Sequence, residues 1–172
     1  MKRIESDKIF VAISCGCFHT IGLDDEGNLY SFGYNDYGQL RLGDNNNRDE
    51  MKKIESDKRF VAFSCGYDYT IVLDDQGCVY SFGNNDYGQL GLGDNDERDK
   101  MVRIESDKIF VAISCGCFHT TMLDDQGFVY SFGNNEYGQL GLCDNNDRDK
   151  MEKIESDKIF VAISCGCDYT IV

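Results

Sequence analysis

Hydrophobic and polar positions repeat along this chain in blocks of fifty residues. In the second block, apolar residues gather in three short runs at 60–65, 69–73 and 79–82, separated by polar stretches rich in Gly, Asn and Asp. No run keeps the i, i+3, i+4, i+7 apolar spacing of an amphipathic helix, and the residues that fill the runs are mostly β-branched or aromatic. The pattern predicts an all-β chain in which each block supplies up to four strands.

The second block illustrates the expected strands and turns. Phe60–Cys65 is apolar on both faces, which predicts a strand buried between neighbouring sheets. The Asp-Asp-Gln-Gly segment at 74–77 predicts a tight hairpin turn in which Gly77 has a positive φ. We expect Met51–Ile54 to form a short first strand of the block. The remaining stretch, 83–100, predicts a loop.

The blocks are close copies of one another. Residues 51–100 and 101–150 are identical at 36 of 50 positions, and 151–172 match 101–122 at 16 of 22. Such a period is typical of stacked supersecondary units, and four strands per unit suit a propeller blade. The sequence therefore predicts a partial β-propeller, an arc of about three and a half four-stranded blades. Its repeats are 1–50, 51–100, 101–150 and the partial unit 151–172, within a single domain 1–172.

Charge and cysteine content narrow the classes of partner. The net charge is −14, and no stripe of Lys and Arg is present, which argues against nucleic acid and anionic membranes as partners. The simplest interpretation of the acidic loops is that their charge keeps the protein soluble. The more specific alternative is that they bind a basic protein. The start of the chain lacks a signal-peptide pattern, and no apolar run approaches the ~20 residues of a membrane span. Nine cysteines, an odd number, predict reduced thiols in an intracellular protein, cytoplasmic or nuclear.

A series of motifs recurs in register in the three complete units. In the second unit it runs from Cys65-Gly66 to Thr70, through Leu-Asp-Asp-Gln-Gly at 73–77, to Tyr-Ser-Phe-Gly-Asn-Asn-Asp-Tyr-Gly-Gln-Leu at 80–90. This series resembles the regulator of chromosome condensation repeat, whose hallmark is Gly-Gln-Leu-Gly-x-Gly after aromatic-Gly-x-Asn. The resemblance covers the whole chain. It implies a seven-bladed propeller of four-stranded blades that acts through exposed loops, as a nucleotide-exchange factor, a ubiquitin-ligase domain or an inhibitor.

The resemblance also assigns structural residues. They are Gly16, His19, Gly33, Gly38, Gln39, Gly66, Tyr69, Gly83, Gly88, Gln89, Gly116, His119, Gly133, Gly138, Gln139 and Gly166. Two positions depart from the glycine pattern of the units. Arg41 stands where the next two units have Gly, and Cys143 stands where the first two units have Gly. If those glycines have positive φ, each replacement strains its loop by roughly 1 kcal/mol.

Cysteine and histidine are the candidate chemical residues. Cys15 and Cys17 lie two apart, as do the matching cysteines of the third and fourth units, which predicts that both sulfurs share one strand face. One cysteine per unit also predicts a ring of thiols. Zinc prefers Cys-x₂₋₄-Cys spacing, so we expect small buried side chains and no metal. His19 and His119 are replaced by Tyr in the other units, which favours a structural hydrogen bond over proton transfer. The resemblance implies a bond within the blade.

Two sets of loop residues are candidate binding sites. The acidic segments 44–49, 94–99 and 144–149 lack the Gly and the distal Glu of a calcium loop, so solvated surface is the better interpretation. Tyr-rich loop tips on a rigid scaffold suit protein recognition. The tips are Tyr34, Asp36, Tyr37, Asn84, Asp86, Tyr87, Asn134, Glu136 and Tyr137. An alternative applies to the last tyrosine of each tip. We favour the interpretation that Tyr37, Tyr87 and Tyr137 pack between blades instead of contacting a partner.

The sequence therefore predicts a protein-binding or scaffold module with no catalytic residue and no cofactor. The alternative is a guanine-nucleotide exchange factor, by analogy with the family alone. The expected partner is a protein, either basic or a small GTPase. Since Val172 falls within a segment that matches a strand, we expect a fragment of a longer protein or an open arc that self-associates through its edges.

Overall fold

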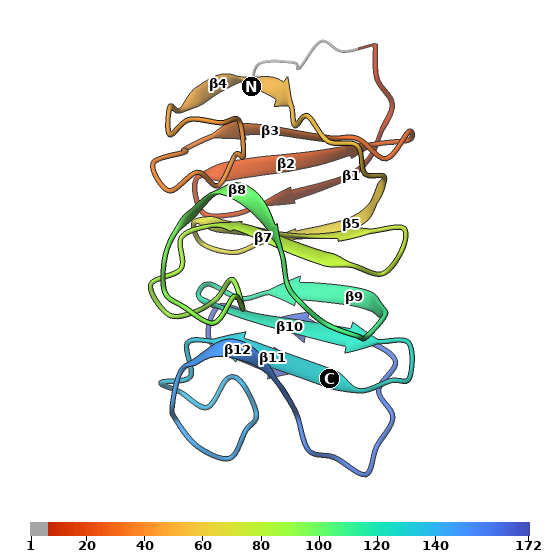
Figure 1. The fold of residues 1–172 in the computed structure, drawn as a ribbon, viewed down its shortest axis with the longest axis vertical. Helices are drawn as coiled ribbons and strands as arrows, with labels where there is room; N and C mark the ends of the chain where they lie inside the picture. The colour runs from red at the N-terminus through yellow and green to blue at the C-terminus, as the bar shows by residue number, and fades with distance from the viewer. Residues whose placement is uncertain (1–6) are drawn as a thin grey trace.

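The structure, a computed structural model, describes residues 7–172 as strands and loops (Figure 1). The first sheet contains β1 (Phe10–Cys15), β2 (His19–Asp24), β3 (Leu29–Gly33) and β4 (Arg48–Lys53). The second contains β5 (Phe60–Cys65), β6 (Tyr69–Asp74), β7 (Val79–Gly83) and β8 (Arg98–Arg103). The third contains β9 (Phe110–Cys115), β10 (His119–Asp124), β11 (Val129–Gly133) and β12 (Arg148–Lys153). A two-stranded sheet follows, of β13 (Ser164–Cys165) and β14 (Thr170–Ile171).

The predicted all-β class and four-stranded blades are confirmed. Each of the three larger sheets is an antiparallel meander, and the hairpin turn ending in Gly77 has the expected positive φ of 77°. Within residues 7–172 there is no helix with the length and apolar character that a membrane crossing requires. The three four-stranded blades lie one after another along the long axis of the molecule, as Figure 1 shows.

The outermost strand of each blade corrects the predicted strand order. Met51–Ile54 was expected to begin its own unit, but residues 51–53 belong to β4, the last strand of the preceding sheet. The predicted loop 83–100 likewise ends early, because β8 begins at Arg98 and pairs with β7. An outer strand has one covered face and one solvated face, so its mostly polar residues gave no apolar signal. The blades are therefore out of phase with the units seen in the sequence.

The hydrophobic core lies between the sheets. One cluster joins the first two blades through residues such as Leu23, Phe60 and Val72, and a second joins the next pair through Ile71 and Phe132. All six residues of β6 are buried. Since each sheet covers the apolar face of its neighbour, neither blade of a pair can bury this surface alone.

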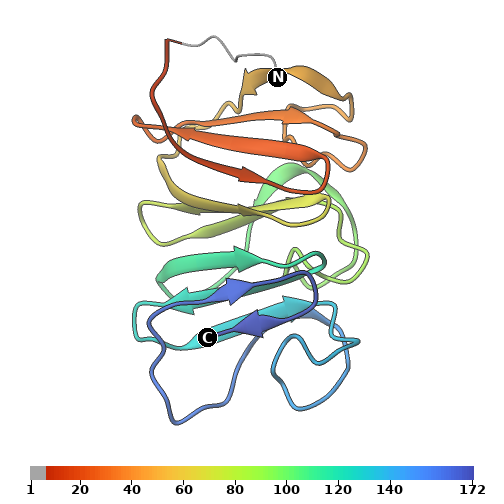
Figure 2. The same ribbon diagram turned by 180° about the vertical axis from the view of Figure 1, so that it is seen from behind.

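The innermost strands are less buried than predicted. Figure 2 shows the side of the stack that carries β1, β5 and β9. Phe60–Cys65 was expected to be buried on both faces, yet Val61 in β5 is 46% exposed. The reason is its position, because β5 is the edge strand of its sheet and has a partner strand on one side only.

Side chains at the start of each second strand join successive blades. His19 Nε2 lies 2.9 Å from Thr70 Oγ1, and His119 Nε2 lies 2.9 Å from Thr170 Oγ1. Between them, the Tyr69 hydroxyl donates to the backbone oxygen of His119. The implied bond within one blade is therefore wrong: these side chains point to the next sheet, where the repeat places a Thr one position further along. We call this set of bonds the blade seam.

Glycine makes room for the seam. A Cβ built on Gly66 would lie 1.8 Å from the ring of Tyr69, and one on Gly116 would lie 2.1 Å from His119 Cε1. The Cys-Gly pair of the repeat is thus a steric requirement, since any larger residue would collide with the ring that crosses to the next blade. Burial of those rings lowers the pKa of both His19 and His119 to about 4.

Acid should weaken the fold through these two histidines. An unfolded histidine has a pKa near 6.5, above its folded value of about 4, so the unfolded chain binds more protons between these pH values. The histidine contribution is therefore complete above pH 6.5 and is lost as pH falls toward 4, by at most ~1.4 kcal/mol per pH unit for each histidine. Urea unfolding at pH 7 and pH 5 measures this loss.

The matched control is the double variant His19→Tyr/His119→Tyr, because Tyr69 fills the same place in the second unit. Its stability should fall less between pH 7 and pH 5 than that of the wild type. An identical loss in both proteins would show that the seam histidines do not titrate on unfolding.

The two departures from the glycine pattern adopt strained backbone conformations. Arg41 has a φ of 54° and Cys143 a φ of 63°, close to the values of 69° at Gly91 and 86° at Gly93 in the second unit. The positive φ expected at these places is confirmed. Residues other than Gly, Asn and Asp rarely adopt this region, because the Cβ of an L-residue crowds the following carbonyl oxygen.

Replacing Cys143 by Gly should therefore stabilise the third blade. Cys143 is exposed and unpaired, so the change removes strain without opening a cavity. We expect relief of the strain to raise the free energy of unfolding by about 1 kcal/mol. The greater conformational freedom of Gly in the unfolded chain offsets part of this gain. Cys143→Ser keeps the Cβ and should give no gain. Equal stabilisation by both variants, measured by urea unfolding, would contradict a backbone origin.

Candidate functional site

The turns and long loops of all blades meet at one end of the sheets. Turns 16–18, 66–68, 116–118 and 166–168 join first to second strands, and loops 34–47, 84–97 and 134–147 join third to fourth strands. Because the strands are antiparallel, both kinds of connection return to the same edge, on the left in Figure 1. We call this edge the long-loop rim. It carries every binding residue predicted from the sequence.

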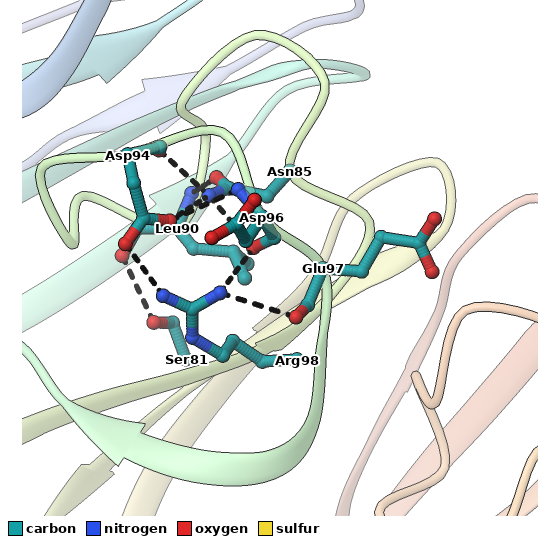
Figure 3. Close-up of polar contacts among 7 residues, drawn as sticks. All are labelled: Ser81, Asn85, Leu90, Asp94, Asp96, Glu97 and Arg98. Carbon is teal, nitrogen blue, oxygen red and sulfur yellow. Dashed lines mark hydrogen bonds and ion pairs between the residues drawn. The ribbon is translucent and has the colours of Figure 1, made fainter.

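A buried asparagine holds each long loop in shape. In the second loop, the Leu90 amide donates to Asn85 Oδ1 at 2.9 Å, and Asn85 Nδ2 donates to the Asp94 backbone oxygen at 2.8 Å (Figure 3). The same pair of bonds recurs around Asn35 and Asn135. A single side chain thus ties both halves of the loop together, and the rim is a fixed surface.

The acidic segments use their first carboxylate internally. Arg98 Nη2 lies 2.6 Å from Asp94 Oδ2, and its Nη1 donates to the backbone oxygens of Asp96 and Glu97 (Figure 3). The Asp96 backbone N–H and the Arg98 guanidinium both lower the pKa of Asp94. Within residues 7–172, no three His, Cys, Asp or Glu side chains are grouped so that they could hold a metal ion. The segment is therefore built around its arginine.

Two predicted contact residues are structural. Asn84 is buried, and its Oδ1 accepts a 2.6 Å hydrogen bond from Gln89 Nε2. Asn134 is buried in the same way, with Gln139 as its donor. Their place in the predicted contact surface was wrong, because the glutamine of the Gly-Gln-Leu motif folds back onto them. The acidic members of the predicted set remain exposed: Asp36, Asp86 and Glu136.

The expectation that the loop-tip tyrosines pack between blades does not hold for all of them. Tyr137 is 68% exposed, so packing between blades is wrong for this residue. Tyr87 packs against Phe118 of the next blade, with ring centroids 5.3 Å apart, but remains 38% exposed. The difference follows from the next unit, which presents Phe118 to Tyr87 but has Asp168 at the corresponding place beyond Tyr137.

Six aromatic rings form a continuous chain along the rim. Successive centroids lie 6.2, 6.1, 5.8, 5.3 and 5.3 Å apart, within the range of favourable ring contacts. In order, the rings are Tyr37, Tyr34, Phe18, Tyr67, Phe118 and Tyr87. We call this set the aromatic stripe. It crosses three blades, and Phe18 near its middle is 58% exposed.

Carboxylates flank the stripe. The Tyr34 hydroxyl donates to Asp36 Oδ2 at 2.9 Å, and this bond raises the pKa of Tyr34 to about 12. Asp68 follows Tyr67 and accepts a hydrogen bond from Gln39 Nε2 at 3.3 Å. Burial, together with the nearby charge of Asp36, raises the pKa of Asp68. The rim therefore combines exposed ring faces with negative charge.

Two family models match the chain. One regulator of chromosome condensation (RCC1) repeat model matches residues 26–73, 76–123 and 126–172, and a second matches 10–39, 60–89 and 110–139. The chain belongs to the RCC1 repeat family. The match confirms the resemblance of the motifs in the sequence.

Solved structures show the same RCC1-type β-propeller fold. Prp20p from Saccharomyces cerevisiae superposes with a TM-score of 0.83 at 20% identity, covering 92% of this chain and 42% of that one. Yeast RCC1 (Prp20) bound to Kap60 gives the same score and identity, with 40% of its chain covered. Human WBSCR16 gives 0.66 at 18% identity, covering 99% and 59%. The present chain thus spans about two fifths of the yeast protein.

Sequence reasoning missed the middle of the aromatic stripe. Phe18, Tyr67 and Phe118 lie in the turns of the RCC1 repeats, one residue or two before the seam residue. The units alternate at this place, with Cys-Phe-His in the first and third and Tyr-Asp-Tyr in the second. That alternation was visible in the sequence. Its meaning required the stacking, which brings residues from consecutive repeats side by side.

A backbone column runs along the same turns and ends in a disulfide. The amide of Cys17 donates to the oxygen of Tyr67, that of Tyr67 to Cys117, and that of Cys117 to Cys167, at 3.1, 3.0 and 2.9 Å. Cys117 and Cys167 form a disulfide, so the prediction that all cysteines are reduced was wrong for this pair. Stacking places equivalent positions of consecutive RCC1 repeats side by side, here with Cα atoms 4.5 Å apart.

The other cysteines remain unpaired, seven in all. Cys17 lies in the turn after β1 ends. The prediction that it shares a strand face with Cys15 is therefore wrong. Burial raises the pKa of the Cys65 thiol to about 12 and raises that of Cys115 as well. Those two sulfurs each donate to the backbone oxygen of a serine in the preceding blade. They therefore behave as small packed side chains, as expected.

Breaking the disulfide should loosen the last hairpin. The bond closes a loop with a sequence separation of 50, for which chain entropy gives up to ~4 kcal/mol. Cys167→Ser should lower the free energy of unfolding, whereas Cys17→Ser, at the equivalent place of the first RCC1 repeat, should change it little. Thiol labelling of the denatured protein should find seven reactive cysteines before reduction and nine after. Nine before reduction would contradict the bond.

Proposed function

We propose that these RCC1 repeats form a protein-binding module whose contact surface is the long-loop rim. The observation that carries the proposal is the aromatic stripe, a chain of six rings over three blades with Phe18 and Tyr87 exposed. Aromatic residues, Tyr above all, supply much of the binding energy at protein interfaces. Contiguous exposed apolar surface on a folded protein typically marks such a contact.

The framework beneath the stripe supports the proposal. Loops pinned by a buried asparagine, and turns joined by the backbone column, are already ordered before a partner arrives. Preorganised surfaces lose less conformational entropy on association, so more of the contact energy appears as affinity. Binding loops on a rigid scaffold are the common arrangement in repeat proteins.

The relatives support a protein partner in general terms. The yeast relative is known in a complex with Kap60, and its binding properties to Gsp1p and histones have been studied. Nucleotide exchange on a small GTPase, the alternative expected from the sequence, has no separate observation in its favour among residues 7–172. An intracellular location remains part of the proposal, supported by seven unpaired cysteines.

Site-specific photocrosslinking tests the position of the contact surface. A benzophenone amino acid is placed at Tyr87 or Tyr137 on the long-loop rim, and at Gln76 or Gln126, exposed in turns at the opposite end of the sheets. Irradiation in an extract of the source cells should give protein adducts mainly from the rim positions. Equal adduct yields from both ends would place the contact surface elsewhere and contradict the proposal.

A further inference from the structure

We infer that the long-loop rim binds an arginine-rich segment of its partner, laid along the aromatic stripe. The inference rests on the proposed function and adds the chemistry of the partner. It is carried by the juxtaposition of exposed ring faces with carboxylates that have no cation of their own among the described rim residues, and by the sign of the charge along this edge.

The exposed rings of the stripe can accept a cation. A cation within about 6 Å of a ring centroid is attracted by the negative face of the aromatic system. The chain already contains two such contacts away from the rim, with Lys58 Nζ 5.1 Å from the Tyr80 centroid and Lys153 Nζ 3.4 Å from that of Phe128. No such internal pairing is seen over the stripe among residues 7–172, so the exposed rings of Phe18 and Tyr87 are available to a cation from outside.

Carboxylates lie in the same groove as Phe18. A shallow groove of about 550 Å³ is lined by Phe18 and Tyr34 together with Asp49 and Asp68. Arg48 also lines this groove, but its Nη2 lies 2.7 Å from Asp44 Oδ2 and its Nη1 donates to the loop backbone. Among residues 7–172, no ion pair is seen for Asp49 or Asp68, so these two acidic groups of the groove have no cationic partner in this part of the chain.

Acidic residues predominate along the whole long-loop rim. The loops 34–47, 84–97 and 134–147 and the turns 66–68 and 166–168 contain eleven Asp or Glu and one Lys or Arg, which is Arg41. Arg41 donates to the backbone oxygen of Glu55, which follows β4. At the opposite end, turns 25–28, 75–78 and 125–128 and segments 54–59, 104–109 and 154–159 contain ten acidic and four basic residues. Three further arginines, Arg48, Arg98 and Arg148, begin the fourth strands beside the long-loop rim, and each is paired with the first aspartate of its own acidic segment. The eight other acidic residues of the rim outnumber its one remaining cation, Arg41.

Together these features favour arginine over lysine. A guanidinium group is planar, stacks on an aromatic face and can hydrogen bond to a carboxylate with its edge at the same time. An ammonium group is a compact and strongly hydrated charge that satisfies one of these contacts at a time. A surface that places carboxylates beside aromatic rings therefore selects the residue able to use both.

Fluorescence anisotropy with a labelled peptide of alternating Arg and Gly tests the inference. The intact chain should bind it, and a Lys-Gly peptide of equal length about threefold to tenfold more weakly, given the size of exposed cation–π contacts. Asp36→Asn/Asp68→Asn should weaken Arg-Gly binding by about threefold to tenfold, from two exposed charge pairs. Phe18→Leu/Tyr67→Leu keeps apolar volume but removes the ring faces, and should weaken binding by a similar factor.

The matched control is Asp25→Asn/Asp125→Asn, which removes the same charge from exposed turns at the opposite end. It should change the affinity less than twofold, an amount below one weak exposed pair. Circular dichroism and thermal melting verify each fold, and the single variants Phe18→Leu and Asp36→Asn serve if a double variant unfolds. Equal loss from the control variant would overturn the inference, because it would show attraction to net charge alone. Indifference to Phe18→Leu/Tyr67→Leu would overturn it as well.

The two proposals fail separately. If the Arg-Gly peptide does not bind while photocrosslinked adducts still form at Tyr87 and Tyr137, the arginine-rich partner is wrong and the rim remains the contact surface. If adducts form equally at both ends, the proposed function is wrong, and peptide binding would then describe a surface without a protein partner.

Discussion

The blade seam is the interaction on which the rest of the structure depends. Each sheet buries its apolar face only against the next sheet. The stack therefore requires an interaction that sets the spacing and rotation of successive blades. The ring of His19, Tyr69 or His119 crosses to the following blade and hydrogen bonds there to a threonine or to the backbone. A glycine beneath each ring provides the necessary space.

The seam also creates the surface that we assign to binding. Residue 19 points inward to the next blade, and its neighbour Phe18 points outward at the rim, so a structural and a surface residue are adjacent in the chain. The backbone column joins the same turns, which places Phe18, Tyr67 and Phe118 in ring contact. The continuity of the aromatic stripe is therefore a consequence of stacking, and a change in the seam should disturb the stripe.

Local features of the fold could be predicted from the sequence. The inner three strands of each blade, the hairpin at 74–77 and the positive φ at Arg41 and Cys143 depend on alternation and turn chemistry within one unit. The position of β8 could not be predicted in the same way, because its polar residues form an outer strand recognisable only from its partner β7. The Cys117–Cys167 bond depends on contact between residues one period apart.

The loop residues show the same division. The sequence pointed to the long-loop rim through Tyr34 and Tyr87, but it could not separate the buried Asn84 from the exposed Asp86 two residues later. That distinction depends on Gln89 folding back onto Asn84, a contact set by the shape of the loop. Phe18 and Phe118 were seen only as a variation between units, since their exposure depends on what the next blade places beside them.

The central claim is that stacking aligns the turns into one aromatic surface that binds protein. Solution NMR with labelled Phe and Tyr rings tests it most directly, by nuclear Overhauser contacts and by peptide titration. The account predicts contacts between Phe18 and Tyr67 and between Tyr67 and Phe118, and resonances of all three rings that shift together with the Arg-Gly peptide while Tyr30, in the middle strand β3, stays unchanged. Missing contacts between these rings, or equal shifts at Tyr30, would contradict it.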